Sequence, residues 1–152
     1  MTTKLIDRGW NNIKTQIKRL QGTEITVGVQ GQEARLKDPD SDATVADIAV
    51  YNHFGTKHIP ARPFLQLALD NNQKQINDFI DKNLNYLMTR KGAQAPAALN
   101  RIGAFLVGAI QREINSNIQP ANAPSTIRQK KSSRTLVDSG RLRSSITYEI
   151  RY

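Results

Sequence analysis

The stretch Ala49–Leu65, which reads AVYNHFGTKHIPARPFL, joins two helical patterns and contains three aromatic residues, one glycine and two prolines. Gly55 can take the positive φ that ends a helix. Pro60 and Pro63 disfavour helix in the residues before them, so we expect Ile59–Arg62 to be extended. Pro63 also has the φ that suits the first turn of a following helix. The stretch therefore predicts a helix, a stop, an extended segment and a second helix.

We call residues 51–64 the elbow, because they connect these two helices at a change of direction. A connection this apolar either folds onto its own core or contacts another subunit. For Arg62, which lies between two prolines, we expect a specific contact with a partner; the alternative is that it caps carbonyls of its own helix ends. The residues of the elbow that we assign to a subunit or partner interface are Tyr51, Phe54, Ile59, Arg62 and Phe64.

Helical patterns cover most of the remaining chain. Residues 64–90 and 96–118 repeat apolar side chains every three or four positions, and the short loop between them predicts an antiparallel helical hairpin. Gly103 lies among other small residues of the second helix, where it would let another helix approach closely. Residues 4–20 form an amphipathic pattern in which Trp10 is the largest apolar anchor.

Two alternating segments predict strands. Residues 23–29 and 144–152 place apolar side chains at every second position, and we expect them to pair antiparallel. Thr44 can cap a short helix over residues 45–54. The predicted fold class is α+β: one domain over residues 1–152, in which a small antiparallel sheet packs against the N-terminal helix and the helical hairpin.

Charge is unevenly distributed along this chain, whose formal net charge is +9. Residues 33–47 contribute −3, with two basic and five acidic residues, and the last 34 residues contribute +5, with seven basic and two acidic residues. Residues 30–43 predict a mobile polar loop, and residues 119–143 predict a basic loop with a short helix over 124–131. Such a distribution suits contacts between identical subunits or a surface that faces DNA. The charged candidates are Asp38, Asp40 and Asp42 for a subunit interface, and Arg128, Lys130, Lys131 and Arg134 for a DNA channel or a charged contact.

The residue inventory argues against an enzyme. The chain has no cysteine, and its two histidines, His53 and His58, flank the expected helix stop, which is poor geometry for a shared metal ion. No glycine-rich nucleotide-binding motif is present, and the acidic residues are too scattered for a two-metal nuclease. We therefore expect no catalytic residue, no cofactor and no metal, and no leader or membrane-spanning segment.

Two blocks of sequence resemble those of a known family. The first is Tyr51-Asn52-His53-Phe54-Gly55-Thr56 followed by Ile59-Pro60-Ala61-Arg62-Pro63-Phe64-Leu65, and the second is Leu136–Ile146, which reads LVDSGRLRSSI. In this order, and with a long helical region between them, they resemble the tail-completion and neck proteins of tailed bacteriophages, the minor virion-morphogenesis or head–tail joining group. The resemblance covers the chain from about Ile25 onward.

The resemblance implies a structural virion protein that forms a ring, typically of six subunits, at the head–tail junction or the head-proximal end of the tail. It implies self-association, contacts with other neck, connector or tail proteins, and packaged DNA passing through the channel. The protein would be in the host cytoplasm before assembly and in the virion afterwards. The composition alone leaves an alternative open, a small basic DNA-binding protein that acts in the host cytoplasm.

Overall fold

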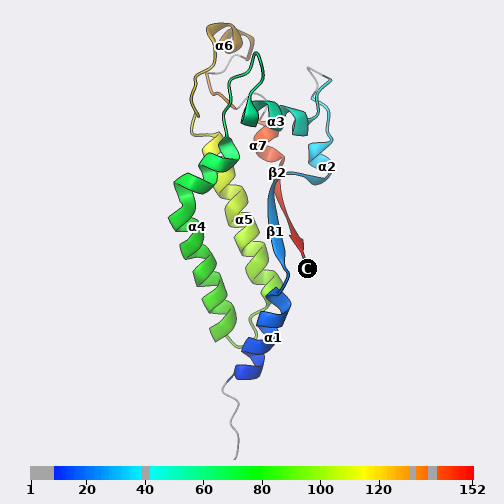
Figure 1. The fold of residues 1–152 in the computed structure, drawn as a ribbon, viewed down its shortest axis with the longest axis vertical. Coiled ribbons are helices and arrows are strands. Elements are labelled where there is room, and N and C mark those ends of the chain that lie inside the picture. Colours follow the sequence, from blue (N-terminus) through cyan, green and yellow to red (C-terminus); the bar gives the residue numbers. More distant parts are fainter. Residues whose placement is uncertain (1–8, 39–41, 131–132, 137–139) are drawn as a thin grey trace, which may run out of the picture.

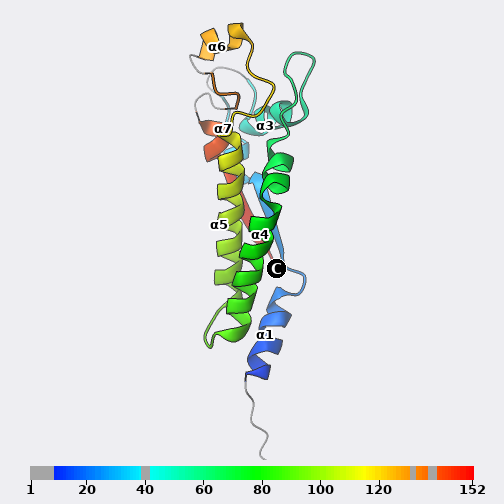
Figure 2. The same cartoon turned by 90° about the vertical axis from the view of Figure 1, so that its left-hand side faces the viewer.

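A long helical pair organises the structure, a computed structural model that describes residues 9–38, 42–130, 133–136 and 140–152. Helix α4 (Phe64–Thr89) and helix α5 (Ala95–Ile114) lie side by side and antiparallel (Figures 1 and 2). The predicted hairpin is confirmed, although α5 ends about one turn before residue 118. The rings of Phe79 and Phe105 stack between the two helices with their centroids 4.2 Å apart. In the part of the chain described, no helix is both long enough and apolar enough to cross a membrane.

A two-stranded sheet packs along this hairpin. Strands β1 (Glu24–Val29) and β2 (Ile146–Arg151) pair antiparallel, with Val27 opposite Tyr148 and Val29 opposite Ile146. A two-stranded sheet is at best marginally stable in water, so it depends on the helices that cover it. The predicted α+β class, with a small antiparallel sheet on a helical pair, is confirmed.

Gly103 marks the place where β2 comes closest to α5. A Cβ atom at this position would lie 2.6 Å from Cγ of the Tyr148 ring, so the ring occupies the space that a side chain would need. The hydroxyl of Tyr148 donates a hydrogen bond to Oδ1 of Asn100 at 2.8 Å, one turn away on the same helix. The expectation that another helix approaches Gly103 is wrong, because an aromatic side chain of the sheet fills this space.

Helix α1 (Trp10–Leu20) lies at one end of the hairpin, against α4 and α5 (Figure 1). Its predicted residues 4–8 lie outside the described part of the chain. The prediction that Trp10 is the main anchor is wrong: Trp10 is 63% exposed, and the buried residue of the helix is Gln16. The side chain of Gln16 donates a hydrogen bond to the carbonyl of Ala93 in the hairpin loop, so a polar contact holds the helix there.

At the other end of the hairpin, the described residues form four shorter helices, α2 (Gly31–Ala34), α3 (Val45–Phe54), α6 (Pro124–Lys130) and α7 (Arg141–Ser144), and we call this part of the molecule the head (Figure 1). The predicted helices α3 and α6 are confirmed there. Helices α2 and α7 were not predicted. Residues 30–43 are not a polar loop throughout their described part, because they contain α2 and because Lys37 forms a bridge with Thr44.

Replacing Gly103 with alanine should destabilise the protein by about 1–3 kcal/mol, because the new methyl group would push the Tyr148 ring away from α5. Gly108→Ala on the same helix is the matched control: there a Cβ would lie 3.4 Å from the flexible end of Arg112, and the higher helix propensity should stabilise by up to about 1 kcal/mol. Urea unfolding of both variants measures the difference. Equal effects would contradict the packing of β2 on α5.

Candidate assembly interface

Helix α3 presents an apolar face to solvent. Its first residues are fixed by a capping box, in which the Thr44 side chain accepts from the backbone N–H of Asp47 and the Asp47 carboxylate accepts from the backbone N–H of Thr44. Hydrogen bonds from the Thr44 side chain and backbone lower the pKa of Asp47 below its ordinary value. On the outer face, Val50 is 51%, Tyr51 41% and Phe54 73% exposed. Exposed aromatic and aliphatic side chains in one group are typical of a contact surface.

The elbow that follows α3 is held closed by its own backbone. Gly55 has φ 77°, and a Cβ atom there would lie 2.8 Å from the backbone nitrogen of Ala61, so only glycine fits the turn. The N–H of Thr56 donates to the carbonyl of Ile59, and the N–H of Arg62 donates to the carbonyl of Asn52, both at 2.7 Å. The predicted helix stop at Gly55 is confirmed. The aromatic face of α3 is therefore attached to a turn of defined shape.

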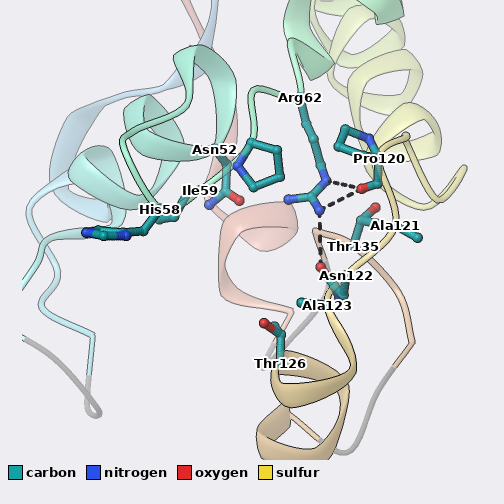
Figure 3. Close-up of a pocket in the computed structure, with 11 residues that line it drawn as sticks. Asn52, His58, Ile59, Arg62, Pro120, Ala121, Asn122, Ala123, Thr126 and Thr135 are labelled. Atoms are coloured by element: carbon teal, nitrogen blue, oxygen red, sulfur yellow. Dashed lines mark hydrogen bonds between the residues drawn. The ribbon is translucent and has the colours of Figure 1, made fainter.

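The side chain of Arg62 joins this turn to a distant segment (Figure 3). Its Nε and Nη2 atoms donate to the carbonyl of Pro120 at 2.9 and 2.6 Å, and Nη2 also lies 3.3 Å from Oδ1 of Asn122. Asn122 in turn donates from Nδ2 to the carbonyl of Arg134. Burial, which leaves Arg62 only 3% exposed, lowers the pKa of its guanidinium.

Phe64 lies on the inner side of the same turn and is fully buried. The ring of His53 packs edge-on against Phe64 and against Phe54, with centroid distances of 5.4 and 4.6 Å. Burial lowers the pKa of His53, which favours the neutral ring at this position. His53 therefore packs between the rings of Phe54 and Phe64.

These contacts divide the residues that were assigned to an interface. Phe64 is inside the core rather than on the surface. The observed hydrogen bonds of Arg62 go to oxygens of its own chain, as the alternative expects, but these oxygens lie in the loop between α5 and α6 and not at a helix end. Tyr51 and Phe54 are exposed, and Ile59 is half-buried on the wall of a cavity described below.

The two sequence blocks that carry the family resemblance meet in one hydrophobic core. Phe64, from the first block, is clustered with Leu136, Leu142 and Ile146, from the second, and with Ala49 of α3. More than 70 residues separate Phe64 from Leu136 in the sequence, and the hairpin brings them together. The residues that look most like a motif are therefore largely the residues that hold the head together.

The charged candidates lie on several parts of the head. Arg128 on α6 and Arg134 are exposed, whereas Lys131 and Asp40 lie outside the described residues. Lys130 is the last residue of α6. Among the acidic residues, the backbone N–H of Asp38 donates to the carbonyl of Ala43, and the fully exposed carboxylate of Asp42 lies 3.8 Å from Lys37. Two further exposed arginines of the head, Arg141 and Arg143, were not among the predicted site residues.

Sequence reasoning missed the acceptors of Arg62. Pro120 and Asn122 follow α5 in a loop rich in small residues, and nothing in their spacing indicates which carbonyl faces a guanidinium 58 residues away. Thr135, which is 1% exposed, was missed for the same reason. In the described residues, no group of three or more His, Cys, Asp or Glu side chains is placed to hold a metal ion.

Comparison of the chain with protein-family models, with curated proteins and with solved structures finds no match in any of the three.

Arg62→Ala should lower the free energy of unfolding by about 2–3 kcal/mol, because the Pro120 carbonyl loses both of its donors and the side-chain oxygen of the buried Asn122 loses a third. Arg62→Lys should recover only part of this loss, since an ammonium group cannot reproduce the two donors of the guanidinium. Urea unfolding of the three proteins is the measurement. An unchanged midpoint for the alanine variant would contradict a structural role for Arg62.

Phe64→Ala should cost about 3–5 kcal/mol of stability, because Phe64 is fully buried at the centre of the head. Phe54→Ala, the matched control ten residues away, should change stability by no more than about 0.5 kcal/mol, since Phe54 is mostly exposed. Thermal and urea unfolding of the purified chain compare the two. A large loss for Phe54→Ala would mean that its ring contributes to the fold and is not available to a partner.

Proposed function

We propose that this protein is a structural component of a tailed-phage virion, which forms a ring at the head–tail junction or at the head-proximal end of the tail. The observation that supports it best is the exposed apolar face of α3, formed by Val50, Tyr51 and Phe54. Its two aromatic residues, Tyr51 and Phe54, lie inside the first block of family resemblance, and the face is attached to a turn that backbone hydrogen bonds close. Its role is to contact other subunits, and no catalytic step is part of the proposal.

The arrangement of the head supports this proposal in a second way. Interfaces of permanent assemblies are more apolar than ordinary surface and are enriched in aromatic residues. Tyr51 and Phe54 would supply such residues, while the core formed by Phe64, Leu136 and Leu142 keeps α3 fixed relative to the hairpin. A surface that is already ordered in the free subunit loses little conformational entropy on assembly. Partners would be further copies of the chain and the neighbouring neck, connector or tail proteins.

The proposal is tested by electron microscopy of a phage lysate in which the gene carries a nonsense mutation. We expect full heads beside unattached tails, or tails of irregular length, and the defect distinguishes a junction from a tail-end position. Complementation with Phe54→Asp should fail, because a carboxylate would be desolvated in an apolar contact. Complementation with Asp78→Asn, a surface change on α4 outside the head, should succeed. Normal infectious particles from the nonsense mutant would overturn the proposal.

DNA binding in the host cytoplasm is the second candidate function, and one observation favours it. Arg128, Arg134, Arg141 and Arg143 are all exposed on the head. Exposed arginines attract phosphate groups without reading sequence. Binding of duplex DNA by the purified chain would support this function, provided that the affinity falls steeply between low and physiological salt. In the ring, the same side chains would face packaged DNA.

A further inference from the structure

Arg62 is a buried cation without an acidic partner. Its residue is 3% exposed, and neither of the ion pairs found in the described part of the chain involves it. Its two hydrogen-bond acceptors, the carbonyl of Pro120 and the side-chain oxygen of Asn122, are neutral. They engage Nε and Nη2, whereas Nη1 makes no hydrogen bond to any described residue. One edge of the guanidinium therefore remains available.

That guanidinium lines a cavity of about 410 Å³ between the elbow and the segment after α5 (Figure 3). None of its eleven lining residues is acidic. Thr135 lines the same cavity, and its hydroxyl is buried and lacks a hydrogen-bond partner. Thr126, whose hydroxyl is a further donor, also lines the cavity. The cavity thus combines a fixed positive charge with several hydroxyl and nitrogen donors.

This combination is suited to a carboxylate. A buried charge is costly unless it is both paired and hydrogen-bonded, and carbonyl acceptors satisfy the hydrogen bonds of Arg62 without neutralising it. A carboxylate in the cavity would accept a charge-assisted hydrogen bond from Nη1 of Arg62, and the Thr135 hydroxyl is a further donor among the lining residues. A cation or an apolar side chain would accept neither.

We propose that the Arg62 cavity binds the carboxylate of Asp42 from a second copy of this chain. The side chain of Asp42 is fully exposed, and its contact with Lys37 at 3.8 Å is a weak surface pair. It lies between Lys37 and Thr44, which are paired by a bridge, and close to the capped start of α3. The Arg62 cavity, which donates the hydrogen bonds, and the Asp42 carboxylate, which accepts them, are on different surfaces of one subunit, so the contact is heterologous, and repetition of it generates a ring or a filament.

Their positions on the head agree with such a contact. Figure 1 places α2, which leads into the acidic loop, and α6, which borders the cavity, on opposite sides of the head. Asp42 belongs to residues 33–47, whose net charge is −3 in a chain of net charge +9. This difference in charge favours the approach of that segment to the basic surface of a neighbouring subunit. The inference rests on the proposed ring and names the polar contact within it.

The binding test uses the purified full chain and a peptide of residues 36–44, LKDPDSDAT, as the probe. The reporter is the Nε–H signal of Arg62 in ¹H–¹⁵N spectra, because this group is buried and hydrogen-bonded. We expect the peptide to shift this signal, and the Asp42→Asn peptide to bind about tenfold more weakly, since it loses a charge-assisted hydrogen bond. The Asp38→Asn peptide, with the same change of charge, is the matched control and should bind within about twofold of the original.

A variant of the cavity makes the test independent of the stability of Arg62. Thr135→Val removes an unpaired buried hydroxyl and keeps the shape of the side chain, so its unfolding midpoint should be unchanged or raised. Its affinity for the peptide should nevertheless fall. Equal affinity of wild type and Thr135→Val, or equal affinity of the three peptides, would overturn the proposal. Acetate is the second probe. If acetate saturates the shift of the Arg62 signal at a lower concentration than the peptide does, the cavity binds a small free carboxylate, and the proposed contact with Asp42 is overturned.

Complementation of the nonsense phage with Asp42→Asn separates this inference from the proposed function. Reduced assembly with Asp42→Asn but not with Asp78→Asn supports the contact. Full assembly with both, in a phage whose nonsense mutant fails to assemble, overturns the Asp42 contact and leaves the proposed function standing. The peptide titration needs no virion, so its result holds even where the nonsense mutant assembles normally.

Discussion

The hydrogen bonds from Arg62 to the carbonyl of Pro120 join the two halves of the head. One half is the elbow, which continues directly into α4, and the other is the segment that leaves α5 and returns towards β2. Without these bonds, the Pro120 carbonyl and the side-chain oxygen of the buried Asn122 would lose the donors that Arg62 supplies. The arginine suits this place because its planar group can donate from two nitrogens to one oxygen while its stem packs against the elbow. The shape of the head depends on this side chain.

The fold was predictable from the sequence where the pattern is local and periodic. The helices 64–90 and 96–118, the capped helix after Thr44 and the two strands repeat apolar residues with a clear period, and the structure contains all of them. Helix α1 shows the limit of this reasoning. Its periodicity predicts the helix, but it does not predict which side contacts the hairpin, and the contact is made by Gln16 rather than by Trp10. A side-chain pattern describes one helix, whereas burial depends on the position of its neighbours.

The candidate site was predictable only in part, for a related reason. The apolar elbow indicated either a core or an interface, and the structure contains a core residue and an exposed one. Phe64 is buried, while Phe54, ten residues earlier in the chain, is exposed. Two prolines and a glycine determine that the chain changes direction, but they do not determine which ring faces which way. The partner of Arg62 lies 58 residues away in a loop without periodicity, so no local signal could have identified it. Long-range polar contacts of this kind are visible only once the topology is known.

A buried cation with neutral partners is a poor way to gain stability, because desolvation costs more than carbonyl hydrogen bonds return. A hydrophobic residue at position 62 could fill the elbow, and the head already has a core of Phe64, Leu136 and Leu142 to hold it together. What an arginine adds is a charge at a fixed position, with one edge facing a cavity that contains an unpaired hydroxyl. The apolar face of α3 can provide affinity for a partner, but apolar contacts discriminate weakly between orientations. A single charged pocket that accepts a carboxylate would fix the orientation of the neighbour, which is what a closed ring requires of each of its contacts.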